Sequence, residues 1–123
     1  KNFIYKSIIF PNKNIYTNNI GIGCVLEPNI LIANNVVIGA GNFIFYGSCI
    51  AHNVTIGNFS NIGCNVVVSG NTKIKDRVHI GANSFISNNL KICSDVFIAP
   101  GSTIFKDINK PGIYKDNTFI QKI

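Results

Sequence analysis

The chain has 123 residues, of which 46% are hydrophobic, so it has room for one domain with a single core. Its formal net charge is +6, but the 11 lysines and arginines are scattered along the chain, and we expect no nucleic-acid partner. No apolar run reaches the ~18 residues that a membrane span needs. No secretory signal opens the chain, and we therefore expect a cytoplasmic protein with no membrane association.

Residues 1–19 precede a regular repeat and keep only Ile8 in its register, which predicts an irregular first coil or a cap. From Ile20 to Ile104, every sixth residue is aliphatic. A period of six is neither helical nor simple alternation, and fifteen consecutive matches indicate a true internal repeat. The members of this column are Ile20, Leu26, Ile32, Ile38, Ile44, Ile50, Ile56, Ile62, Val68, Ile74, Ile80, Ile86, Ile92, Ile98 and Ile104.

Two further columns explain the period. The residue two places before each aliphatic is mostly small or β-branched, and it shares a strand face with the aliphatic because side chains alternate along a strand. Three places after the aliphatic, thirteen of fifteen residues are Gly, Asn or Asp, the types that best tolerate a left-handed backbone. Each hexad is therefore a short strand followed by a sharp corner. Three corners close a triangle, so residues 20–109 are predicted to form about five regular 18-residue coils of an all-β, single-stranded parallel β-helix.

The period breaks at Lys110-Pro111-Gly112, so residues 110–123 are predicted to be a C-terminal tail that folds back. The four cysteines, at positions 24, 49, 64 and 93, lack the close spacing of a zinc or redox motif. We therefore expect no metal site and no disulfide.

The three outward faces of the predicted prism differ in polarity. One face is expected to be solvent-exposed, whereas the other two carry apolar residues. The exposed face carries Thr55, Lys73, Lys75 and Lys91. Apolar surface of this extent implies burial against partners, and two distinct apolar faces suit a closed threefold ring. We expect a homotrimer. The apolar residues are Val25, Phe43, Phe45 and Phe97 on one face and Leu31, Val67, Phe85 and Phe105 on the other.

The hexads IGNFSNIGCN and VHIGANSFI resemble the hexapeptide-repeat acyltransferase superfamily. A closer resemblance, carried by SIIFPNKNIYTNNIGIGCVL and GSCIAHNVTIGNFSNIGCNVVVSGNTKI, is to the sialic-acid O-acetyltransferase and nucleotide-sugar N-acetyltransferase family. This resemblance implies that the β-helix is left-handed. It also implies a trimer with active sites between subunits and the use of acetyl-CoA to acetylate a sugar amine or hydroxyl. Family members usually carry an N-terminal nucleotide-binding domain as well.

The resemblance implies that His52 is the catalytic residue, since a family histidine sits at this place between acidic residues. Here its neighbours are Ala51 and Asn53. Asn53 occupies the corner position of its hexad, which accounts for an asparagine there, and we expect no catalytic role for it. A second family histidine corresponds to Asn61, which we expect to bind the acetyl carbonyl or orient the acceptor. His79 points outward, and a surface or interface role is expected for it.

Small residues in the last coils match those along which the family's pantetheine lies. The expected cofactor-binding residues are Gly81, Ala82, Ala99 and Gly101, together with Lys106, one of several lysines near the C-terminus that would favour the phosphates of acetyl-CoA. The usual C-terminal Gly-Asn-Pro-Ala-Lys segment of the family is replaced here by YKDNTFIQ.

These observations predict an acetyl-CoA-dependent N- or O-acetyltransferase acting on a sugar or nucleotide sugar, within cell-surface polysaccharide biosynthesis. The first alternative is a non-catalytic assembly or binding module, which the missing acids near His52 favour. The second is a γ-class carbonic anhydrase, but that enzyme needs three metal-binding histidines and this chain has two.

Overall fold

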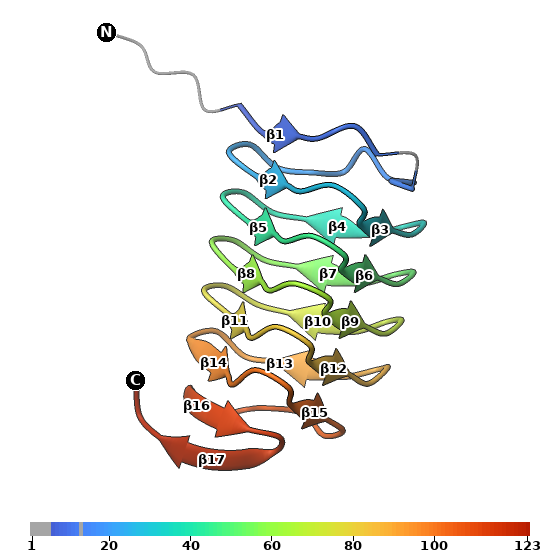
Figure 1. Ribbon diagram of the computed structural model, residues 1–123. Helices are drawn as coiled ribbons and strands as arrows, with labels where there is room; N and C mark the ends of the chain where they lie inside the picture. Colours follow the sequence, from blue (N-terminus) through green and yellow to red (C-terminus); the bar gives the residue numbers. More distant parts are fainter. Residues whose placement is uncertain (1–5, 13) are drawn as a thin grey trace, which may run out of the picture.

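A computed structural model describes residues 6–12 and 14–123, and within them it contains strands but no helix. The chain winds as a column of stacked triangular coils with its two ends at opposite ends of the column (Figure 1). The fold is the predicted left-handed parallel β-helix. Among the described residues, nothing forms a helix of the length and hydropathy that crossing a bilayer requires.

The strands form three sheets, one for each side of the triangle (Figure 1). Sheet A contains β1 (Ile8–Ile9), β2 (Val25–Leu26), β5 (Phe43–Ile44), β8 (Asn61–Ile62), β11 (His79–Ile80), β14 (Val96–Ile98), β16 (Gly112–Lys115) and β17 (Thr118–Gln121). Sheet B contains β3 (Leu31–Ile32), β6 (Cys49–Ile50), β9 (Val67–Val68), β12 (Phe85–Ile86) and β15 (Thr103–Ile104). Sheet C contains β4 (Val37–Ile38), β7 (Thr55–Ile56), β10 (Lys73–Ile74) and β13 (Lys91–Ile92).

The inward column of aliphatic residues lies where the sequence predicts it. From Leu26 to Ile104 every member of the column is buried. Each member up to Ile86 pairs with the residue eighteen positions later, as Ile44 does with Ile62. Burying such a side chain contributes about 1.5–3 kcal/mol, so this column is the main source of stability.

The corners also follow the prediction. A positive φ occurs at fourteen of the fifteen expected corner positions, all except Asp107. Phe59 and Arg77 adopt this conformation too, with φ of 56° and 52°, although neither residue type favours it. Arg77 is held there by Asp95, whose carboxylate accepts from its guanidinium at 2.7 Å.

Inner polar residues have a role that the sequence pattern did not predict. The Ser60 hydroxyl donates to the Lys75 carbonyl and accepts from the Val78 amide. In the same way, each of three other inner side chains donates to the carbonyl fifteen positions later and accepts from the amide eighteen positions later: Asn42, Ser48 and Thr72. These side chains satisfy backbone groups at the corner of the next coil. Among the described residues, no buried side-chain nitrogen or oxygen lacks a partner.

The first coil is shorter than the sequence register predicts. Ile9 pairs with Leu26 and Ile15 with Ile32, each seventeen residues apart, whereas Ile20 pairs with Ile38 at the regular eighteen. The expectation that Ile8 keeps the register is therefore wrong by one position, because one residue is missing between Ile15 and Ile20.

The C-terminal segment continues the helix before it reverses. Ile108 pairs with Ile92 and Tyr114 with Ile98, so β16 adds a parallel strand to sheet A, and β17 then returns antiparallel to β16. The turn between them covers the edge of β15, since Asp116 accepts from the Thr103 amide and Asn117 from the Phe105 amide. With strands at both ends, the column has about six turns rather than five.

Candidate active site

His52 lies at the edge of the prism where sheet B turns into sheet C, between β6 and β7. The turn is set by Asn53, whose φ is 60°. The His52 side chain is exposed, and its Nδ1 lies 3.2 Å from the Asn53 Oδ1. When the amide oxygen accepts a hydrogen bond from Nδ1–H, Nε2 carries no proton and is the basic nitrogen of the ring. Asn53 therefore orients the imidazole in addition to forming the corner.

Gly70 lies directly beyond His52, one coil further along the same edge. A Cβ added to Gly70 would lie 2.7 Å from both Cε1 and Nε2 of His52, so the imidazole can keep this position only while residue 70 is glycine. Gly70 was not among the residues predicted for the site. Its position was available from the repeat, because it lies one coil length after His52.

Asn61 is exposed on sheet A, in β8, and its ladder neighbours are Phe43 and His79. Sheet A is the side of the triangle opposite the edge that carries His52 (Figure 1). The two residues therefore do not come together within one chain, and a shared site requires two copies.

His79 is half-buried on sheet A, where its ring stacks on Phe97 with centroids 4.7 Å apart and planes 4° apart. Burial lowers the pKa of His79 below its ordinary value. His79 and Phe97 thus form one stacked pair on sheet A, and Phe43 and Phe45, whose ring centroids are 4.2 Å apart, form another.

Four of the five expected cofactor-binding residues lie together at the edge between sheets A and B. Gly81 and Ala82 belong to one coil and Ala99 and Gly101 to the next, and the Gly101 amide donates to the Ala82 carbonyl at 2.8 Å. Gly81 is buried, and a Cβ there would lie 2.5 Å from the Pro100 nitrogen. Gly101 has a φ of 69° and open space on its outer side.

Lys106 lies elsewhere, on the same edge as His52 and three coils further along. The lysine beside the small residues is Lys115, whose Nζ donates to the Gly101 carbonyl at 3.0 Å. The predicted site residues thus form two groups on two edges. One group contains His52 and Lys106, and the other contains the four small residues beside Asn61 and sheet A. Among residues 6–12 and 14–123, no group of three or more His, Cys, Asp or Glu is placed to hold a metal ion.

The fold and its repeats define a left-handed β-helix of the hexapeptide class. The family model described as "Bacterial transferase hexapeptide (six repeats)" matches residues 71–106, which confirms the predicted repeat over that segment. No curated protein matches the chain in a sequence comparison.

Solved structures with the same fold include a complex with CoA and GDP-perosamine and an acetyltransferase domain. PerB from Caulobacter crescentus, in complex with CoA and GDP-perosamine, is 18% identical with a TM-score of 0.85, over 90% of this chain and 54% of that one. The acetyltransferase domain of PglB from Neisseria gonorrhoeae, in complex with acetyl coenzyme A, is 21% identical with a TM-score of 0.85, over 97% of this chain and 58% of that one. This chain therefore spans little more than half the length of those structures. At these identities the likeness concerns the fold.

A hexapeptide transferase family protein from Anaplasma phagocytophilum is 14% identical with a TM-score of 0.60, over 98% of this chain and 84% of that one.

Proposed function

We propose that this protein transfers an acetyl group from acetyl-CoA to an amino or hydroxyl group of a nucleotide sugar or a related sugar. The observation that carries the proposal is the exposed His52, seated on Gly70 with Nδ1 at 3.2 Å from Asn53. The sequence resemblance at this position supports it, as do fold neighbours that hold CoA with GDP-perosamine or acetyl coenzyme A.

The chemistry is direct attack on the thioester without a covalent enzyme intermediate. His52 Nε2 accepts the proton of the attacking amine or hydroxyl as the new bond forms at the acetyl carbon. The carbon–sulfur bond then breaks, and the proton passes from the imidazolium to the CoA thiolate. With its Oδ1 toward Nδ1, Asn53 leaves Nε2 as the proton acceptor, but its neutral amide stabilises the imidazolium less than a carboxylate would. We therefore expect proton transfer to be slower here than with an acidic neighbour.

The complete site requires a homotrimer of about 40 kDa, three times the 13.4 kDa of the chain. We propose that the His52 edge of one subunit packs against sheet A of the next. His52 and Lys106 then form one wall of the groove, and Asn61 with Gly81, Ala82, Ala99 and Gly101 forms the other. In this arrangement Asn61 bonds the acetyl carbonyl or orients the acceptor, pantetheine lies along the small residues, and Lys106 attracts a cofactor phosphate.

A non-catalytic binding or assembly module is the second candidate, favoured by the uncharged partner of His52. Two measurements separate it from the enzyme: a thermal shift with acetyl-CoA, and release of free CoA in the presence of a panel of amino sugars and their nucleotide esters. An acetyltransferase should show a higher melting temperature with acetyl-CoA and should release CoA only when an acceptor sugar is present. A chain that neither binds acetyl-CoA at millimolar concentration nor releases CoA is the non-catalytic module.

Sedimentation tests the assembly independently. A species of about 40 kDa at micromolar concentration is expected, and a stable monomer would contradict the two-subunit site.

A further inference from the structure

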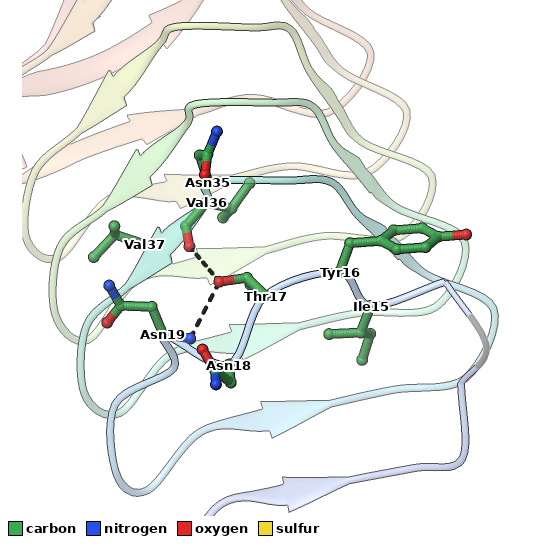
Figure 2. A pocket seen from close by; sticks show the side chains of 8 residues that line it. All are labelled: Ile15, Tyr16, Thr17, Asn18, Asn19, Asn35, Val36 and Val37. Carbon is green, nitrogen blue, oxygen red and sulfur yellow. Dashed lines mark hydrogen bonds between the residues drawn. The ribbon is translucent and has the colours of Figure 1, made fainter.

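The short first coil opens a pocket on the surface of the prism. Its volume is about 690 Å³, and its walls include Tyr16, Thr17, Asn18 and Asn19 from the first coil and Asn35 and Val37 from the second. Figure 2 shows the three asparagine side chains around this corner, with the Tyr16 ring projecting to one side.

The pocket arises from the missing residue between Ile15 and Ile20. The spacing across this corner is five positions in the first coil, from Ile15 to Ile20, and six in the next, from Ile32 to Ile38. The first corner is therefore tighter than the one stacked on it. The Thr17 hydroxyl bridges the two, since it donates to the Val36 carbonyl at 2.9 Å and accepts from the Asn19 amide at 3.1 Å (Figure 2). The space that a regular corner would fill remains open.

The lining of this pocket is mostly polar and contains no charged side chain. Asn18, Asn19 and Asn35 are exposed, and no protein partner for their side-chain amides occurs in the described part of the chain. Each amide can donate and accept at once, which matches the vicinal hydroxyls of a sugar. Tyr16, 57% exposed, adds an aromatic ring at the rim. With no charged side chain in its walls, the pocket suits a neutral, hydroxyl-rich ring better than a phosphate.

The pocket lies on the edge that carries His52. The Asn53 amide donates to the Asn34 carbonyl at 3.1 Å, so the corner that contains Asn35 is in direct contact with the His52 corner. Neighbouring coils are about 4.8 Å apart, which is close to the length of one sugar ring. A ring held by the asparagines can therefore present an amine or hydroxyl to His52.

We propose that this first-coil pocket binds the ring of the acceptor sugar, with Asn18 and Asn35 as its principal hydrogen-bonding residues. The role of this pocket as an acceptor site rests on the proposed acetyl transfer. Sugar binding itself can be measured without turnover. A sugar bound here would reach the thioester from the N-terminal side of His52, while acetyl-CoA extends from the C-terminal side toward Lys106.

The test is the binding of a free amino sugar to the whole chain in the absence of acetyl-CoA. Saturation-transfer NMR measures this binding. Asn35→Gly removes the amide but keeps the left-handed corner, and Asn18→Ala removes the second amide. Asn89→Gly is the matched control, because Asn89 has the same φ of 60° on the same edge three coils away. We expect the first two variants to weaken binding about fivefold each, the effect of one lost neutral hydrogen bond, and the control to bind like the parent.

Three outcomes would overturn the inference: no sugar binding by the parent, equal binding by all three variants, or displacement of the sugar by a nucleoside diphosphate without its sugar. Failure of the proposed function is a separate outcome. If the parent binds the sugar in this pocket but does not bind acetyl-CoA, the sugar site stands and the acetyltransferase proposal is wrong.

Discussion

The regular coils and the first coil of this protein are built from the same hexads but do different things. In the regular coils, every position is determined by the repeat: the aliphatic fills the core, the inner serine or threonine bonds the next corner, and Asn or Gly turns the chain. In the first coil one residue is missing, and a polar pocket opens beside the His52 edge. The repeat thus builds the scaffold, and the departure from it in the first coil leaves a pocket on the surface.

The largest expected effect comes from breaking the regular part. Ile62 is fully buried, and Ile62→Asp places an unpaired carboxylate in a closed core, which costs several kcal/mol and should unfold the prism. Lys73 is exposed on sheet C, and Lys73→Asp should leave the melting temperature nearly unchanged. Comparable melting temperatures for the two variants would show that the register is wrong.

Inserting one glycine after Asn18 should turn the first coil into a regular one. The insertion restores the regular spacing of six from Ile15 to the next inward residue, so the corner should fill the pocket. Sugar binding should then weaken about 25-fold, the loss of two neutral hydrogen bonds at about fivefold each. The melting temperature should not fall by more than a few degrees, since the core residues stay in place. Retained sugar affinity in NMR titration would contradict this origin of the pocket.

Gly70→Ala should displace the His52 imidazole without disturbing the core. The added Cβ would lie 2.7 Å from the ring, so the ring must move, and we expect turnover to fall roughly tenfold to a hundredfold, since general-base catalysis depends on position. A double-mutant cycle with His52→Ala checks the mechanism. If Gly70→Ala lowers the rate as much in the His52→Ala background as in the parent, its effect does not act through His52.

The smallest expected effect is a pH dependence from His79. Because burial lowers its pKa in the folded state, the unfolded chain takes up the proton more readily. Stability should therefore be complete above the unfolded pKa of about 6.5 and decrease as pH falls through it toward the lowered folded value. Melting curves between pH 5 and pH 8 measure this, and His79→Phe should reduce the slope. An unchanged slope would assign the pH dependence to another group.

The sequence predicted the regular coils well, because the position of each residue between Ile20 and Ile104 follows from a strict period of six. It predicted the ends less well. An end coil has a neighbour on one side only, so a missing residue between Ile15 and Ile20, or two between Ile104 and Ile108, is tolerated and leaves no mark in the pattern.

The candidate site was predictable in part. The resemblance selected His52, and the structure places it on an exposed edge. The part of Asn53 in orienting the imidazole depends on a side-chain rotamer, which no spacing rule gives. The separation of Lys106 from the four small residues follows from the three-edged geometry, which becomes clear only when positions are grouped by edge.

Turnover of His52→Ala tests the central claim most directly. The rate of CoA release from acetyl-CoA, with an amino-sugar acceptor that the parent uses, should fall by roughly 10²–10⁴. The melting temperature and the sedimentation coefficient should stay those of the parent. A variant that acetylates as fast as the parent would contradict the account, because the proton of the acceptor would then be removed without His52.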